Sequence, residues 1–303
     1  MRTLVLRTVS ACMALGGSVC AAESAGGRVE ELAGEHVGEH AGEGLTIDAP
    51  LLWDIDLPFW PGHSLPISNS LVMYALAVVV ITLILRLATR RMERIPRGFQ
   101  NLVEWVFETL YNFVQGLTGP YLAKKYFWYF SSVFLLILVS NYMGLIPGVG
   151  EILYEGKPLF RGANADLNVT IFLGFFYAIL WFIWVMREQG LKHFLLHTFG
   201  PKGGLTGFLK YALLPIFFFV GLIELLSICI RPVALAARLF GNIFAGEAIL
   251  EQMGAIGWLA MLPFMALELI VGFVQALVFL MLTALFLKTQ VGGEDESEEE
   301  ASS

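Results

Sequence analysis

Long apolar stretches dominate the chain, and several approach 20 residues without a charged side chain. A bilayer core about 30 Å thick is crossed by about 20 helical residues, so stretches of this kind predict membrane-spanning helices. We expect an all-α integral membrane protein with five transmembrane helices, placed at residues 71–85, 127–146, 168–185, 211–253 and 261–287.

Residues 98–118 have a different pattern, because apolar and polar positions alternate with the period of a helix. The apolar positions are Leu102, Val106, Leu110, Phe113 and Leu117. Glu104 and Glu108 fall between them. This pattern predicts one amphipathic helix that lies along the membrane interface, in addition to the five spans.

The segment 211–253 is too long for one perpendicular span, and it can be interpreted in two ways. It could form two spans with a tight turn near Pro232, or one long and strongly tilted helix that bends there. A single crossing places Lys288 and the acidic tail inside the cell. We therefore favour the single helix, which would form a long hairpin with the last span.

Both ends of the chain lie outside the apolar stretches. Arg2 and Arg7 accompany a short apolar run that is followed by small residues, which is the pattern of a secretory signal peptide. A short first membrane helix is the alternative interpretation. We divide the chain into a signal peptide (1–22), an acidic external extension (23–66), a membrane domain (67–290) and an acidic cytoplasmic tail (291–303).

The distribution of basic residues gives the orientation. The connections 86–125 and 187–210 carry 11 Lys or Arg, whereas the connection 148–167 carries two. Cytoplasmic loops are enriched in these residues, so the first two connections are assigned to the cytoplasm. An exported N-terminus and a cytoplasmic C-terminus give the same topology, that of a bacterial inner-membrane protein.

Composition excludes several classes of function. Hydrophobic residues make up 57% of the chain and the net charge is −7, which excludes a soluble enzyme and a nucleic-acid binder. The sequence has no G-x-x-x-x-G-K-[ST] nucleotide loop. The H-x-x-E-H pattern at His36–His40 lies in a Gly-rich acidic linker, and His193 and His197 fit an interfacial helix face. We expect neither a metal site nor a cofactor.

The last two apolar segments contain six ionisable side chains. They are Glu224, Arg231, Arg238, Glu247, Glu251 and Glu268. Each such group costs free energy inside a membrane, and it is retained where it forms part of an ion or proton pathway. Six of them in two helices predict a pathway of this kind.

The spacing of these groups predicts a path in two parts. Glu224, Arg231 and Arg238 are seven residues apart and share a helix face, and Asn242 stays near that face. Glu247 is half a turn away and about 13 Å further outward.

In the last helix, Glu268 and Gln275 share a face, and a hairpin near residue 257 would bring them level with Glu247 and Arg238. An Arg cannot pass a proton on, so it would interrupt the path while carboxylates on either side carry protons. The alternative is a secondary ion-coupled transporter, but the chain has no second copy of the Arg-Asn-Glu pattern.

The sequence resembles subunit a of the F-type ATP synthase over residues 65–290. The resemblance rests on the run Arg231-Pro-Val-Ala-Leu-Ala-Ala-Arg238-Leu-Phe-Gly-Asn242-Ile-Phe-Ala-Gly-Glu247. Glu268, Gln275 and the run Asn141-Tyr-Met-Gly-Leu-Ile-Pro147 reinforce it.

The resemblance implies a function and a set of partners. The chain would be a proton-translocating stator subunit, without enzyme activity of its own, that works with c-ring proteolipids, b-type peripheral stalk subunits and the remaining synthase subunits in membrane lipid. Arg238 would face the c-ring carboxylate, and Glu224 would serve the inner half-channel. The outer half-channel would be lined by Asn242, Glu247, Glu268 and Gln275, and Asn141 is also assigned to proton translocation.

The chain also departs from the family pattern. Many members pair a His with the Glu of the outer half-channel, whereas Glu247 and Glu268 are both acids here. Two carboxyl groups that share a low-dielectric site do not both ionise at low cost, so the pair is expected to hold one shared proton. Many members also carry an acid where Gly144 stands.

Overall fold

The computed structural model describes most of the membrane domain and short parts of the segments around it. The described residues are 7–8, 10–11, 14, 51–56, 64–90, 98–146, 153–154, 157–158, 162–190, 194 and 208–291. Most of the acidic extension, the tail, His36–His40, His193 and His197 lie outside them. The predictions made for those segments therefore stay predictions.

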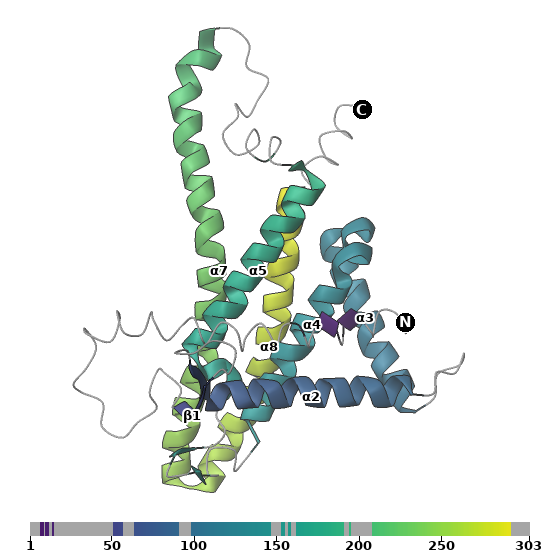
Figure 1. The fold of residues 1–303 in the computed structure, drawn as a ribbon, viewed down its shortest axis with the longest axis vertical. Helices are drawn as coiled ribbons and strands as arrows, with labels where there is room; N and C mark the ends of the chain where they lie inside the picture. The colour runs from purple at the N-terminus through teal and green to yellow at the C-terminus, as the bar shows by residue number, and fades with distance from the viewer. Residues whose placement is uncertain are drawn as a thin grey trace, which may run out of the picture.

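Five helices of the described chain are long and apolar enough to cross a membrane, as predicted. They are α2 (Asn69–Thr89), α4 (Pro120–Gly144), α5 (Leu167–Glu188), α7 (Phe208–Ile256) and α8 (Trp258–Val291). Figure 1 shows α5, α7 and α8 running side by side, while α2 lies across the lower part of the bundle. The all-α class of the membrane domain is confirmed.

Two short β-hairpins lie next to the membrane helices, one before α2 and one between α4 and α5, and the sequence did not predict them. β1 (Leu51–Asp56) pairs antiparallel with β2 (Ser64–Ser68) directly before α2. β3 (Leu153–Tyr154) pairs with β4 (Lys157–Pro158) between α4 and α5. β3 and β4 have two residues each, which is too few for an alternating pattern, and β1 lies in the segment predicted to be an acidic extension. A single 3₁₀ turn, η1 (Ala163–Ala165), connects β4 to α5.

The segment 211–253 forms part of one helix, so the prediction of a single long helix is confirmed. α7 runs through Pro232 without a break and ends at Ile256. At 1.5 Å per residue its 49 residues extend about 74 Å, which exceeds the thickness of a bilayer core. Gly257 makes the turn into α8 with a φ of 152°, a value that side-chain-bearing residues rarely adopt.

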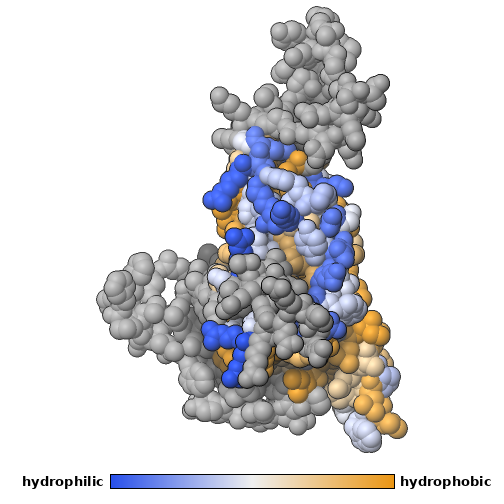
Figure 2. All heavy atoms as spheres, turned by 90° about the vertical axis from the view of Figure 1, so that its right-hand side faces the viewer, coloured by the Kyte–Doolittle hydropathy of each residue, from blue (hydrophilic) through white to orange (hydrophobic). Residues whose placement is uncertain are grey.

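The amphipathic helix is α3 (Phe99–Thr118), and it packs against α4 and α8. Its buried stripe is Gln100, Val103, Phe107, Leu110, Val114 and Thr118. Of the predicted apolar positions, Leu110 belongs to this stripe, whereas Leu102 is 56% exposed. α3 has apolar side chains on more than one side, and periodicity alone does not tell which side meets the protein. Figure 2 shows hydrophilic side chains gathered on the side of the molecule that carries α3.

The core of the membrane domain is centred on α4. Its buried aromatic residues pack against α3 and α5, with Phe127 lying 5.2 Å from Tyr111 and Tyr129 lying 4.9 Å from Trp184, measured between ring centres. α5 is also tied to α8, because Tyr177 Oη donates to the carbonyl of Thr283 at 2.8 Å. These contacts fix α8 relative to α4 and α5, and α8 in turn supports α7.

Candidate functional site

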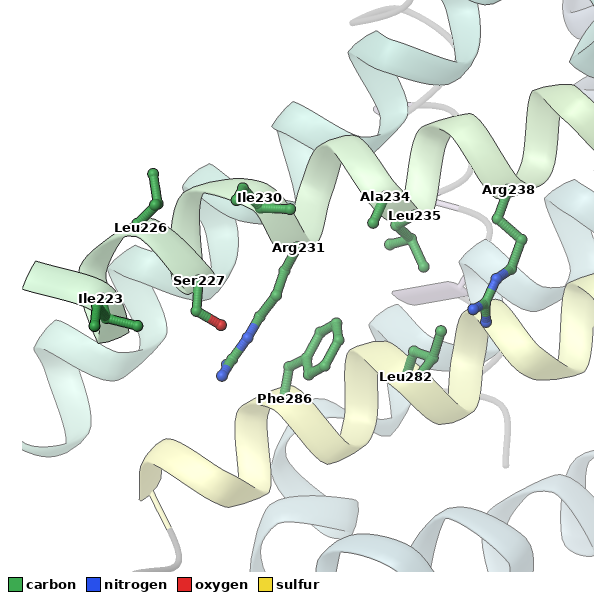
Figure 3. Close-up of a pocket in the computed structure, with 10 residues that line it drawn as sticks. All are labelled: Ile223, Leu226, Ser227, Ile230, Arg231, Ala234, Leu235, Arg238, Leu282 and Phe286. Carbon is green, nitrogen blue, oxygen red and sulfur yellow. The ribbon is translucent and has the colours of Figure 1, made fainter. Parts of the chain in front are cut away.

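Two arginines of α7 border one cavity between α7 and α8. Arg231 and Arg238 both point from α7 toward α8, as Figure 3 shows. The cavity has a volume of about 390 Å³, and Ser227, Leu282 and Phe286 are among its other lining residues. The seven-residue spacing therefore places both guanidinium groups at the same cavity, as the sequence indicated.

Arg238 stands on an exposed surface of small side chains. Ala234, Gly241 and Ala245 lie at helical spacing around it, and all four residues are exposed. A Cβ atom added at Gly241 would meet nothing within 4 Å. The opposite side of α7 is buried through Ala236 and Ile243. Small residues allow another helix to approach the backbone closely, so this face leaves Arg238 accessible to a partner helix.

Glu247 turns away from that cavity and toward the loop before α5. The backbone N–H of Gly162 donates a hydrogen bond to Glu247 Oε1, with a nitrogen–oxygen distance of 3.1 Å. Glu247 is half-buried and does not line the cavity of the two arginines. The half-turn offset from Arg238 thus puts the acid on a different side of α7.

Glu268 on α8 lies directly against α7, next to the position of Glu247. The side chain is 8% exposed, and its carboxyl group contacts Gly246, where a Cβ atom would overlap with it. Glu268 Oε1 has no hydrogen-bond partner among the described residues. Glycine at 246 is what allows the carboxyl group to reach the α7 backbone. The two acids therefore occupy neighbouring places, between Arg238 and the turn at Gly257.

A chain of buried hydrogen bonds connects four elements beside these acids. Tyr74 Oη on α2 donates to Asn164 Oδ1 in η1. Asn164 Nδ2 donates to Asn141 Oδ1 on α4 at 2.6 Å, and Asn141 Nδ2 donates to the carbonyl of Gly272 on α8 at 3.1 Å. Asn141 was a predicted site residue, whereas Tyr74 and Asn164 were missed.

Comparison with known proteins assigns the chain to a family. The family model described as ATP synthase A chain matches residues 71–288. The chain belongs to the ATP synthase A chain family. This assignment confirms the resemblance noted in the sequence and agrees with a multi-pass membrane fold.

Proteins named ATP synthase subunit a are similar over most of their length. The relative from Trichlorobacter lovleyi is 32% identical over 228 residues, which are 75% of this chain and 89% of the relative. The relative from Campylobacter fetus is 30% identical and matches 75% of this chain and 92% of its own length. The relative from Geobacter sulfurreducens is 31% identical, with 75% and 90% covered.

The remaining predicted site residues lie along the same two helices. Asn242 on α7 and Gln275 on α8 are half-buried, and Glu224 is half-buried on α7, seven residues before Arg231. Glu251, the sixth charged group of the two segments, is exposed near the end of α7. Their roles in this member of the ATP synthase A chain family stay predictions.

Sequence reasoning missed Gly162 and Gly246 as well as Tyr74 and Asn164. Gly162 and Asn164 lie in a short polar connection, and Tyr74 lies in a uniformly apolar helix. Gly246 could have been found, because a small residue beside an intramembrane acid often marks close helix contact. The other three act through long-range contacts that no local pattern encodes.

Proposed function

We propose that this chain is the proton-translocating stator subunit of a rotary F-type ATP synthase. Two offset half-channels would lead protons to and from a carboxylate on the c-ring, and Arg238 would separate them. The observation that carries the proposal is the position of Arg238 on an exposed face of small residues, between a cavity on one side and the half-buried Glu247 and buried Glu268 on the other. Membership of the ATP synthase A chain family supports the same function.

Arg238 suits the boundary between two half-channels for a chemical reason. A guanidinium group stays protonated at every accessible pH, so protons do not pass through it. Its positive charge can form a transient ion pair with a carboxylate that a neighbouring helix carries past it. Each ring carboxylate would give up its proton on one side of Arg238 and receive one on the other.

The outer half-channel would use Glu247 and Glu268. Both acids lie outward of Arg238, and Glu268 Oε1 has no partner among the described side chains and backbone groups. A buried carboxyl group in this position is costly when charged, so a proton shared with Glu247 lowers its free energy. Asn141, Asn242 and Gln275 would supply hydrogen bonds to water along this path.

The inner half-channel would begin at the cavity of the two arginines. The cavity is large enough for several water molecules at about 390 Å³, and Ser227 adds a hydroxyl group to its lining. Glu224 lies further inward on the same helix and would pass protons to the cytoplasm. The basic connections 86–125 and 187–210 would face the cytoplasm, with the N-terminus outside.

The partners follow from the exposed surfaces of α7 and α8. Both helices expose large apolar side chains, including Ile223, Leu226, Ile270 and Phe273. Membrane lipid or another apolar helix would cover them, and the small residues around Arg238 favour the two-helix proteolipids of a c-ring at that point. The b-type peripheral stalk and the nucleotide-binding subunits would complete the complex, since this chain has no nucleotide loop.

The test is proton pumping by the complete complex in inverted membrane vesicles. The Arg238→Ala variant should assemble, hydrolyse ATP and pump no protons, because the barrier between the half-channels and the partner of the ring carboxylate are both lost. Arg187→Ala, at the exposed inner end of α5, is the matched control and should pump normally. Normal pumping by an assembled Arg238→Ala complex would overturn the proposed function.

A further inference from the structure

The connection between β4 and α5 reaches the interior of the membrane domain. Residues 162–166 are all buried, although they form a loop and a single 3₁₀ turn. A loop is normally placed at the surface, because its backbone groups need hydrogen-bond partners. Here the N–H of Gly162 finds its partner in a side chain of α7, Glu247 Oε1, at 3.1 Å.

Two glycines allow the loop to come this close. A Cβ atom at Gly162 would overlap with Glu247 Oε1. A Cβ atom at Gly144, near the end of α4, would lie 3.0 Å from the Cα atom of Gly162, which is tighter than nearly all real contacts. Neither glycine has a positive φ, so the reason for glycine at both positions is space and not backbone conformation.

The loop is held in place from both of its sides. Ala165 N donates to the carbonyl of Gly162 at 3.0 Å, which closes the 3₁₀ turn. Asn164 is bonded to Tyr74 on α2 and to Asn141 on α4. Asp166 caps α5, because its Oδ1 accepts from the N–H of Asn168 at 3.0 Å. The position of the Gly162 amide is therefore set by three helices.

We propose that Gly162 is a positioning residue for the outer proton path, and that its N–H fixes the carboxyl group of Glu247. An amide N–H donates a hydrogen bond but neither accepts nor releases a proton under these conditions. It can therefore hold one carboxyl oxygen without diverting the proton that the other oxygen exchanges. Gly144 has a supporting role, because it makes room for the loop where an acidic side chain would displace it. This inference rests on the proposed role of Glu247 in proton translocation.

The test compares Gly162→Ala with the same change in a Glu247→Ala background. In the otherwise unchanged complex, Gly162→Ala should slow ATP-driven pumping about tenfold, the fold-change that corresponds to losing one hydrogen bond to a charged group. In the Glu247→Ala background the added methyl group meets no carboxyl oxygen, so Gly162→Ala should cause no further loss. A merely structural role would give the same loss in both backgrounds.

Two further variants make the outcome decisive. Gly116→Ala on α3 is the control, because a Cβ atom there meets nothing within 4 Å, and it should pump normally. Gly144→Ala displaces the loop without touching Glu247 and should behave like Gly162→Ala in both backgrounds. It takes the place of Gly162→Ala if that complex fails to assemble.

The possible results separate the two proposals. Normal pumping by Glu247→Ala alone would overturn the role of Glu247 and thus part of the proposed function. If Glu247→Ala does slow pumping, two results would overturn only the positioning role of Gly162. One is unaffected pumping by the glycine variants, and the other is an equal loss in both backgrounds.

Discussion

The guanidinium carbon of Arg231 lies 4.9 Å from the ring centre of Phe286, across the groove between α7 and α8. Arg231 thereby keeps its charge over an aromatic face, which is a favourable contact for a cation. One of its nitrogens, Nη1, is buried and has no hydrogen-bond partner among the described residues. Arg238 borders the same cavity but stands on the exposed face of α7. The two arginines thus have different surroundings, and we expect different consequences when each is replaced.

Arg231→Ala should slow proton pumping without abolishing it. Arg231 lies about 10 Å along the helix from Arg238, on the side proposed to face the cytoplasm, so its loss leaves the proposed barrier between the half-channels in place. The measurement is the initial rate of ATP-driven acidification in vesicles, compared with Arg238→Ala. A complete block by Arg231→Ala would show that the barrier is formed by both arginines together.

Glu247 and Glu268 should act as a pair that shares one proton. Glu247→Gln or Glu268→Gln alone should slow proton flux, because the remaining acid and water still form a path. The double variant should lose far more than the product of the two single losses, since no acid is left in the outer path. Flux rates for the three variants decide the question, and strictly independent effects would contradict a shared proton.

Tyr74→Phe should weaken the membrane domain without changing the chemistry of proton transfer. The change removes the donor to Asn164, whose Oδ1 then lies buried without its partner, at a cost of about 1–3 kcal/mol. The measurement is the temperature at which the purified complex loses this subunit. Tyr142→Phe, near the end of α4, is the control because Tyr142 is 37% exposed and should leave that temperature unchanged. An unchanged temperature for Tyr74→Phe would show that the hydrogen bond adds nothing to stability.

Residues 23–50 should be dispensable for coupling. They are rich in acids and glycine and lack apolar periodicity, so they oppose burial. A chain with residue 22 joined to residue 51 should assemble and pump at the normal rate. Extending the deletion through residue 57 also removes β1, the partner of β2 before α2, and should lower the amount of assembled complex. Equal amounts of complex from both deletions would show that the hairpin has no role in assembly.

Much of the fold could be predicted because membrane helices are encoded locally. Every backbone group in a bilayer needs an internal partner, so a long apolar stretch has few alternatives to a helix. That constraint was enough to predict α2, α4, α5 and α8. For α7, the number of membrane crossings was enough to favour one long helix over two spans. It did not give the orientation of α3, whose apolar side chains lie on several sides, or the two hairpins, of which β3 and β4 contain too few residues to show a period.

The sequence by itself determined which ionisable groups the last two helices carry and where each lies along its helix. A helix has a fixed rise and rotation, so the numbers 231, 238 and 247 already give relative depth and direction. Only the tertiary structure decided what each group touches. The contact of Glu268 with Gly246, the bond from Gly162 to Glu247 and the chain from Tyr74 through Asn164 and Asn141 to Gly272 all join different elements. Such contacts depend on how helices and loops pack in three dimensions, and no local period in the sequence records that packing.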